Sequence, residues 1–167
     1  GFDYAKANFK GVDFTWEMSK QKRMFLTGNQ AIAFGATAGG CKFYSAYPMT
    51  PASGILHWLA PRGAKYGIVV KQCEDEIAAM NMAVGAGHVG ARSMTGTSGG
   101  GFALMTEAIG LAAMIEAPVV IVNAMRGGPS TGSNVHSLIF VTPQSIWSMV
   151  MAAPGTFGAS AHRFNTN

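Results

Sequence analysis

The chain has 167 residues, of which 49% are hydrophobic and only 12% are charged, and its formal net charge is +4. Ordinary globular domains carry about 25% charged residues, so this composition predicts that part of the surface is buried against partner subunits. The length predicts one domain with a substantial core. The basic residues form no stripe interleaved with aromatic residues, which argues against nucleic acid as a partner.

Membrane and metal chemistry find little support in the sequence. The longest apolar runs are broken by Gly, Thr or Glu before they reach the roughly 18 residues that a membrane span needs, and no signal peptide opens the chain. We therefore predict a cytoplasmic protein that does not bind membranes. Cys41 and Cys73 have neither CxxC spacing nor clustered histidines, so we interpret them as buried small apolar residues, with a metal or redox role as the alternative. No metal site and no set of iron-sulfur ligands is predicted.

Residues 1–22 carry much of the basic charge and show little periodicity, which predicts a linker or the tail of a preceding domain. The chain begins at Gly1, so we expect it to be a segment cut from a longer reading frame. The ordered pattern begins at Met24. Strands are predicted at 24–27, 42–47, 66–71, 92–95 and 118–123, and helices at 28–40, 51–60, 74–88 and 101–116. This alternation predicts an α/β three-layer sandwich with a mainly parallel sheet.

The predicted helix at 101–116 is apolar nearly all round. Such a helix is buried on every side, so one of its faces must meet something other than its own sheet. An obligate oligomer would supply that cover.

A stiff turn follows the predicted strand at 42–47. Pro48 and Pro51 each fix one backbone angle and restrict the residue before them, so the hydroxyl of Thr50 is held between a strand and a helix. Open α/β sheets place ligands, especially anions, at such positions. A connection punctuated by proline that binds no ligand is the alternative.

Two further candidate segments follow predicted strands. Glu74, Asp75 and Glu76 open a helix, where acidic residues most often just complement the helix dipole. The Gly-rich segment Thr97-Ser98-Gly99-Gly100-Gly101 could admit a close backbone approach by a cofactor or a partner. It lacks the lysine of a phosphate-binding P-loop, so the pattern does not support nucleotide binding.

The last candidate segment is Arg126-Gly127-Gly128-Pro129-Ser130-Thr131-Gly132, after the apolar strand predicted at 118–123. A guanidinium on a Gly-rich turn, with two hydroxyls a few residues on, suits a bidentate grip on a carboxylate or a phosphate. An ordinary loop is the alternative.

Together these segments resemble the α subunit of 2-oxoacid:ferredoxin oxidoreductases, most closely the 2-oxoglutarate type. The resemblance spans about residues 24–132 in order, and no single short motif carries it. Its matching segments are Gly28-Asn29 with Ala31 and Ala33, Tyr47-Pro48-Met49-Thr50-Pro51, Glu74-Asp75-Glu76-Ile77-Ala78-Ala79, Thr97-Ser98-Gly99, Thr106-Glu107-Ala108-Ile109-Gly110-Leu111-Ala112, and residues 126–132. Gly100 stands where the family usually has proline, which would loosen that turn but remove no functional group.

The resemblance implies that residues 23–132 form a thiamine-diphosphate-binding (pyrimidine) domain. The family decarboxylates a 2-oxoacid, passes electrons through iron-sulfur clusters to ferredoxin and gives the acyl group to coenzyme A. Alternatives are a pyruvate or branched-chain 2-oxoacid enzyme of the same family, or a non-catalytic assembly or regulatory module with this fold.

Residue roles also follow from the resemblance. Glu76 matches the glutamate that hydrogen-bonds the aminopyrimidine ring and promotes the tautomer that forms the reactive ylid, and Ser98 and Gly99 match the cofactor-binding turn. Thr50 matches a threonine implicated in 2-oxoacid and coenzyme A binding. Arg126 and Thr131 match residues implicated in holding the 2-oxoacid.

The resemblance also implies a partner chain. In the family the diphosphate, its Mg²⁺ and an iron-sulfur cluster belong to a β subunit, so the cofactor site is shared between the two chains. We therefore expect this chain to be inactive alone, and further copies of both subunits to take part in the assembly.

The resemblance stops after Gly132, where the family continues with a segment like Pro-Thr-Lys-Thr-Glu-Gln-Ser-Asp-Leu. No Asp, Glu, Lys or Arg occurs from 127 to 162, although about four would be expected at this chain's charge fraction. We interpret 133–167 as a tail read out of frame, with a divergent native segment as the alternative.

Residues 136–140 can be encoded CAC AGT CTG ATC TTC, which from its third base reads Gln-Ser-Asp-Leu. The same frame gives His-Gly-Asp-Gly from residues 148–152. DNA in which no single insertion or deletion near codon 133 restores the family pattern would reject this hypothesis.

Overall fold

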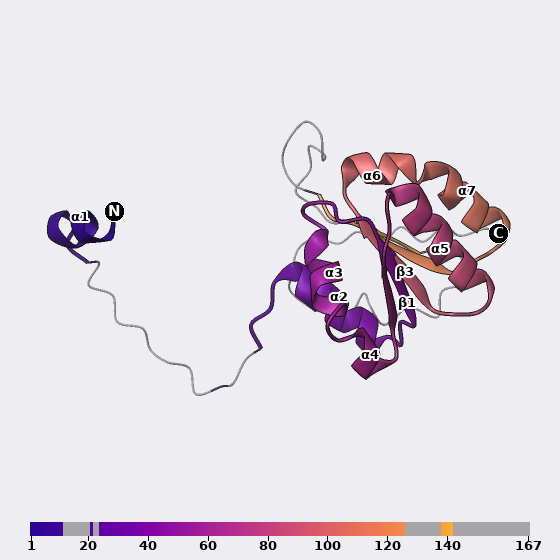
Figure 1. Ribbon diagram of the computed structural model, residues 1–167, viewed down its shortest axis with the longest axis horizontal. Coiled ribbons are helices and arrows are strands. Elements are labelled where there is room, and N and C mark those ends of the chain that lie inside the picture. Colours follow the sequence, from indigo (N-terminus) through magenta and orange to yellow (C-terminus); the bar gives the residue numbers. More distant parts are fainter. Residues whose placement is uncertain (12–20, 22–23, 126–137, 142–167) are drawn as a thin grey trace.

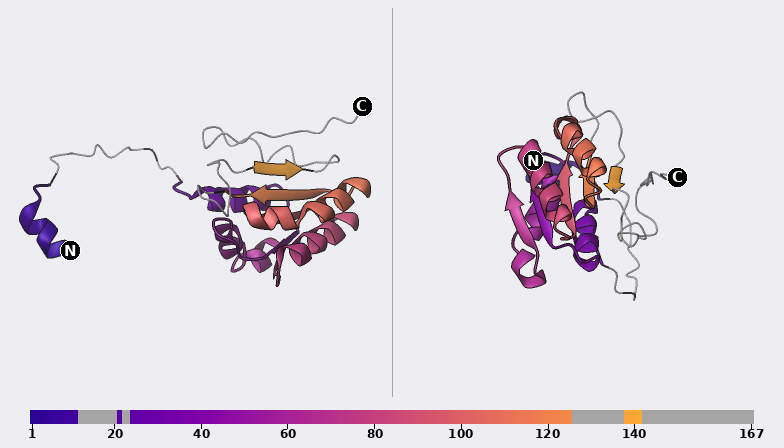
Figure 2. Two further views of the ribbon diagram at one scale, coloured as in Figure 1. Left: turned by 90° about the horizontal axis from the view of Figure 1, so that it is seen from above. Right: turned by 90° about the vertical axis from the view of Figure 1, so that its right-hand side faces the viewer.

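The structure, a computed structural model, describes residues 1–11, 21 and 24–125, together with the backbone of 138–141. A five-stranded sheet in the order β2-β1-β3-β4-β5 forms its centre. The strands are β1 (Phe43–Ala46), β2 (Val69–Gln72), β3 (Ser93–Thr97), β4 (Val119–Asn123) and β5 (Leu138–Val141). The first four run parallel, and β5 pairs with β4 in the antiparallel direction, as the two opposed arrows in Figure 2 show.

Helices cover both faces of this sheet (Figure 1). The helices beside the sheet are α2 (Gly28–Ala38), α3 (Ser53–Leu59), α4 (Gly63–Tyr66), α5 (Glu76–His88), α6 (Gly99–Leu104) and α7 (Thr106–Met114), and a further helix, α1 (Phe2–Asn8), lies away from it. Helices α2 and α3 pack on one face, whereas α5 and α7 pack on the other. The prediction of a three-layer α/β fold with a mainly parallel sheet is confirmed.

Strands β3 and β4 are buried along their whole length, as expected for central strands of a parallel sheet that is covered on both faces. Their side chains alternate between the two cores. Met94 and Val120 contribute to the core under α2 and α3, while Val119 and Ile121 contribute to the core under α5 and α7. This alternation decides which residues share a face at the functional edge of the sheet.

The strand predicted at 24–27 is wrong. These four residues have no regular secondary structure, and the side chain of Phe25 is 95% exposed. Thr27 instead caps α2: its Oγ1 accepts from the Gln30 backbone N–H at 3.3 Å, and the Gln30 side chain accepts from the Thr27 N–H at 3.0 Å. Because of this capping box, Thr27 starts helix α2 and does not belong to a strand.

Most other predicted elements differ from the observed ones by one or two residues at their ends, and two differ more. Part of the strand predicted at 66–71 is the short helix α4, which ends at Gly67 in the left-handed conformation (φ 64°), so β2 begins at Val69. The helix predicted at 101–116 begins two residues earlier and is divided into α6 and α7 at the fully buried Met105. There the Met105 N–H bonds the carbonyls of both Gly101 and Phe102, which tightens the turn between the two helices.

Only parts of the two terminal segments belong to the described residues. Helix α1 lies in the segment predicted to be a linker and buries none of its residues. Of the tail at 133–167, only the backbone of β5 belongs to the described part, so the out-of-frame interpretation stays a hypothesis. The boundaries proposed at 22 and 132 likewise stay predictions.

Both cysteines are buried and carry free thiols, as predicted. Burial raises the pKa of the Cys41 thiol to about 11, and burial also raises the pKa of Cys73. These thiols are therefore poor nucleophiles at neutral pH. Within the described ranges, no helix has the length and apolar character needed to cross a bilayer.

Candidate active site

The carboxyl ends of β1 to β4 lie at one edge of the sheet because these strands are parallel. The chain moves from β1 outward to β2 and then crosses back over β1 to β3. Open α/β sheets bind ligands beside such a reversal, in the crevice outside the strand ends. Thr50 follows β1 and Ser98 follows β3, so these two candidate residues flank the reversal.

Two neighbouring acids at the start of α5 have separate roles. Asp75 is the N-cap, and its carboxylate accepts a hydrogen bond from the Ala78 backbone N–H at 2.7 Å. Glu76, the first residue of the helix, is only 4% exposed, and its Oε1 has no hydrogen-bond partner among the residues that the structure describes. A buried carboxylate oxygen without a donor is costly, so this atom is suited to a ligand that donates a hydrogen bond.

The Glu76 side chain lies against Gly101 of α6. A Cβ atom at position 101 would stand 2.7 Å from both Cγ and Oε1 of Glu76 and would collide with Oγ1 of Thr97. The acidic turn after β2 and the Gly-rich turn after β3 are therefore in direct contact, although about twenty residues separate them along the chain. Glycine at 101 leaves the space that the carboxylate occupies.

Further unpartnered polar atoms lie at the same edge. Ser98 is completely buried with an extended backbone, and its hydroxyl has no partner within the described part of the chain. Asn123 ends β4 directly opposite Thr97, and its buried Oδ1 has no partner there either. Thr97 and Asn123 share the α5 face of the sheet with Glu76. Sequence reasoning missed Asn123, although a polar residue at the end of a wholly apolar strand was a usable signal.

Thr50 is exposed. The residues on either side of it, Met49 and Pro51, both accept hydrogen bonds through their carbonyls. The Ser53 N–H donates to the Met49 carbonyl at 3.0 Å, and the Asn29 side-chain amide donates to the Pro51 carbonyl at 2.6 Å. The peptide bond between Thr50 and Pro51 is cis. Asn29 was also missed as a site residue, although it belongs to one of the resembling segments.

Not every predicted residue can be placed. Arg126 and Thr131 lie outside the described residues, so their approach to Glu76 stays a prediction. Gly99 begins α6 beside Ser98, as the predicted cofactor turn requires. Thr50, Glu76, Ser98 and Gly99 thus all lie at the carboxyl edge of the sheet.

Comparison with known proteins shows the family of the chain. Residues 34–138 match the family model described as pyruvate flavodoxin/ferredoxin oxidoreductase, thiamine-diphosphate-binding. The chain belongs to this family. The 2-oxoglutarate synthase subunit KorA of Archaeoglobus fulgidus is 51% identical over 107 residues, covering 64% of this chain and 31% of that protein. The 2-oxoacid:ferredoxin oxidoreductase 1 subunit alpha of Sulfurisphaera tokodaii is 48% identical over 127 residues, covering 68% and 20%.

A solved structure agrees with the assignment. The 2-oxoglutarate:ferredoxin oxidoreductase from Magnetococcus marinus, with 2-oxoglutarate, coenzyme A and succinyl-CoA bound, has a TM-score of 0.67 and 42% identity. The match covers 78% of this chain and 23% of that one. The chain thus spans about a third or less of the length of the relatives it matches.

The described residues of this thiamine-diphosphate-binding domain suit one part of that cofactor. Glu76 offers a buried, unpartnered oxygen to a hydrogen-bond donor, such as a protonated ring nitrogen, and Gly101 keeps the approach to it free of side chain. Within the described ranges, no three His, Cys, Asp or Glu side chains gather as a metal site would need. These described residues suit the pyrimidine ring of the cofactor.

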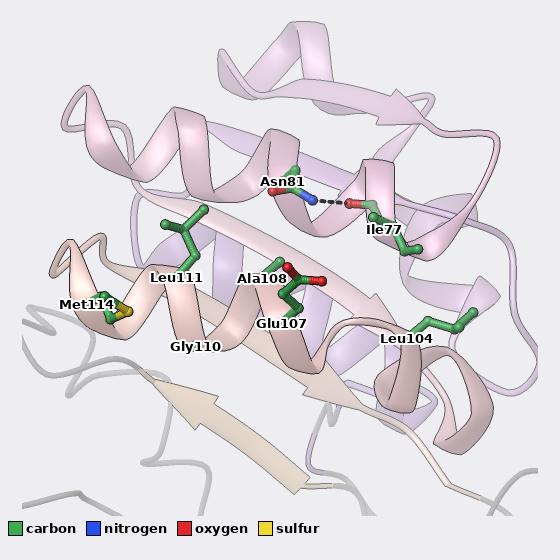
Figure 3. A pocket seen from close by; sticks show the side chains of 8 residues that line it. All are labelled: Ile77, Asn81, Leu104, Glu107, Ala108, Gly110, Leu111 and Met114. Atoms are coloured by element: carbon green, nitrogen blue, oxygen red, sulfur yellow. Dashed lines mark hydrogen bonds between the residues drawn. The ribbon is translucent and has the colours of Figure 1, made fainter.

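An apolar groove runs along the outer side of the same layer, between α5 and α7 (Figure 3). It encloses about 520 Å³ and is lined by Ile77, Asn81, Leu104, Glu107, Ala108, Gly110, Leu111 and Met114. Met114 is 85% exposed and Leu104 54%. The helix that the sequence predicts to be buried on every side is therefore open on this side in the isolated chain.

Proposed function

We propose that this chain is the pyrimidine-binding domain in the α subunit of a thiamine-diphosphate-dependent 2-oxoacid:ferredoxin oxidoreductase. The enzyme would convert a 2-oxoacid and coenzyme A into acyl-CoA and carbon dioxide, and pass two electrons to ferredoxin. The observation that carries the proposal is the buried oxygen of Glu76 against Gly101, which has no hydrogen-bond partner in the described part of a chain of the thiamine-diphosphate-binding family.

Each candidate residue has a role in this proposal. Thiamine diphosphate, when bound, supplies a nucleophilic carbon for attack on the 2-oxoacid carbonyl. Glu76 holds a proton between its carboxylate and the pyrimidine ring nitrogen, while Ser98 and Gly99 form the turn that the ring approaches. Thr50 binds the 2-oxoacid or coenzyme A with its exposed hydroxyl. Arg126 pairs with the 2-oxoacid carboxylate, and Thr131 contributes a hydrogen bond.

The substrate that we favour is 2-oxoglutarate. Several relatives at about 50% identity are described as 2-oxoglutarate synthase subunits, and the structural neighbour holds 2-oxoglutarate and succinyl-CoA. Pyruvate and branched-chain 2-oxoacids are the alternatives, because part of the pocket that measures substrate length belongs to other segments of the enzyme. Rates for a panel of 2-oxoacids in the reconstituted enzyme would decide between them.

The proposal requires a partner chain. A β subunit would supply the diphosphate site, the Mg²⁺ and an iron-sulfur cluster, and ferredoxin would accept the electrons in the cytoplasm. The exposed apolar groove between α5 and α7 supports this requirement, because contiguous apolar surface of this kind marks interaction sites. Isolated, the chain would be inactive, since it holds only one side of the cofactor.

The role of Glu76 can be tested in the complete α subunit co-expressed with its β subunit. Glu76→Ala should lower the 2-oxoacid-dependent reduction of a viologen dye by roughly 10²-fold or more, because the proton held at the ring nitrogen is lost. Glu76→Gln keeps the shape but not the acid and should be similarly impaired. Exposed Glu116 gives the matched control, and Glu116→Gln should retain the parent rate.

Two results would count against this function. Full activity in Glu76→Ala would reject the role assigned to the residue. A parent complex that binds thiamine diphosphate but reduces no dye with any 2-oxoacid would favour the non-catalytic module.

A further inference from the structure

The turn that carries Thr50 is tied to α2 by Asn29, which precedes Pro51 by 22 residues. Asn29, in the first turn of α2, donates from its side-chain amide to the Pro51 carbonyl at 2.6 Å. Pro51 precedes the N-cap of α3, so its carbonyl takes no part in the hydrogen bonding of that helix. The carbonyl of Pro51, the residue that follows Thr50, is therefore held by a side chain from another element.

Gly54 makes this contact possible. A Cβ atom at position 54 would stand 2.8 Å from Nδ2 of Asn29 and 3.1 Å from its Cβ. Only a residue without a side chain lets α3 come this close to the amide. Two residues from different helices, Asn29 and Gly54, thus fit each other around the start of α3.

The element that supplies the amide is itself well anchored. Helix α2 starts with the capping box of Thr27 and Gln30, and its Ala33 and Ala36 are completely buried in the core. The Thr50 turn is otherwise closed by the hydrogen bond from the Ser53 N–H to the Met49 carbonyl, which lies within the turn. A bond within the turn sets its shape, whereas the bond from Asn29 sets its position relative to the sheet.

We propose that Asn29 is a positioning residue that holds the Thr50 hydroxyl where it meets the 2-oxoacid or coenzyme A. The inference rests on the function proposed above for Thr50. Misplacing a group by about 1 Å can cost 10²-fold in kcat/KM, so a side chain that fixes this turn affects ligand binding without touching the ligand.

The test compares variants of the complete α subunit in complex with its β subunit. Asn29→Asp keeps the shape but replaces the donor by a carboxylate that repels the Pro51 carbonyl, and Asn29→Ala removes the side chain. Gly54→Ala leaves Asn29 in place and crowds its amide. Asn8→Asp is the control, because Asn8 donates in the same way to the Tyr4 carbonyl, at 2.8 Å, in exposed α1.

We expect the KM for 2-oxoglutarate or for coenzyme A to rise about tenfold in Asn29→Ala and further in Asn29→Asp. The KM of Gly54→Ala should rise about as much as that of Asn29→Ala. In all three, kcat at saturation and the Kd of thiamine diphosphate should stay within about twofold of the parent, which loss of folding or assembly would not allow. Calorimetric titration with 2-oxoglutarate and with coenzyme A should show the same loss of affinity, independently of turnover. Asn8→Asp should behave as the parent.

The outcomes separate this inference from the proposed function. A parent complex that neither binds 2-oxoglutarate or coenzyme A nor reduces the dye overturns both. A parent that binds and reacts, with Asn29→Ala and Gly54→Ala unchanged in KM and in both affinities, overturns the role of Asn29 alone. Equal losses in kcat and in thiamine diphosphate affinity would show a merely structural role and would also reject it.

Discussion

The absence of a side chain at position 101 determines where the Glu76 carboxylate lies. In Gly101→Ala the added Cβ would stand 2.7 Å from Oε1 of Glu76, so the carboxylate must move from the strand edge. We expect the Kd of thiamine diphosphate to rise at least tenfold in the assembled enzyme. The free energy of unfolding should fall by about 1 to 3 kcal/mol, the usual cost of overpacking.

Gly35 provides the comparison for this change. It lies inside α2, and outside that helix no atom of the described residues comes within 4 Å of an added Cβ, so Gly35→Ala should leave cofactor affinity unchanged. Titration of each variant with thiamine diphosphate and Mg²⁺ measures both effects. Equal affinities in Gly101→Ala and the parent would mean that Glu76 does not contact the cofactor from its present position.

Two sequence interpretations of the acidic turn after β2 prove to belong to two different residues. The interpretation that an acid complements the helix dipole applies to Asp75, which caps α5 and accepts a hydrogen bond from the Ala78 N–H. A role at a ligand suits Glu76, which is buried without a partner among the described residues. The sequence could not separate them, because burial depends on Gly101, which arrives from a distant segment.

Helix α5 offers a prediction at the level of a whole element, because it contains two glycines with opposite surroundings. Apart from its own helix, an added Cβ at Gly85 meets no atom of the described residues within 4 Å, whereas at Gly87 it would stand 2.7 Å from the Pro118 carbonyl oxygen and 3.3 Å from Oγ of Ser93. Gly85→Ala should raise the free energy of unfolding by about 0.5 to 1 kcal/mol, since alanine favours the helix. Gly87→Ala should lower it by about 1 to 3 kcal/mol, because α5 would be pushed from the sheet.

Urea unfolding of the two variants beside the parent would measure these changes. Effects of the same sign would mean that α5 does not pack against the start of β4 as described.

The sequence predicts an element well when nearby residues alone determine its structure. The strand predicted at 118–123 is found as β4 because its run of β-branched residues suits a doubly covered strand in any parallel sheet. Residues 24–27 are equally apolar, yet they have no neighbouring strand, and the cap at Thr27 takes the segment into a helix instead. Strand pairing depends on tertiary structure, which a local pattern cannot show.

The residues of the candidate site also fall into those that a local motif reveals and those that only the fold reveals. Thr50 and Glu76 stand in recognisable local motifs and could be named from the sequence. Asn29 and Asn123 could not, since one bonds the carbonyl of Pro51 and the other lies opposite Thr97 on the neighbouring strand. Such roles appear only when the fold brings distant segments together.

The low charge of the whole molecule has a structural counterpart in the α5–α7 groove. With 12% charged residues, the chain leaves several large apolar side chains of this layer uncovered, among them Ile77, Leu104, Leu111 and Met114. Scattered exposed apolar residues are normal, but these four line one groove. Glu76, the first residue of α5, lies at the carboxyl edge of the sheet, so a chain seated in the groove would also lie near the cofactor.

Disrupting the groove should therefore weaken assembly rather than folding. Met114→Glu places a charge on a side chain that is 85% exposed in the isolated chain, so the free energy of unfolding should change by no more than about 0.5 kcal/mol. Burying that charge against a β subunit is costly, and the dissociation constant of the complex should rise at least tenfold. Val89→Glu is the control, because Val89, the C-cap residue of α5, is 80% exposed but does not line the groove. Capture of each variant by an immobilised β subunit, with thermal unfolding alongside, measures both quantities. If Met114→Glu binds as tightly as the parent, the β subunit does not cover this groove, and the missing surface charge must be explained by a contact elsewhere on the chain.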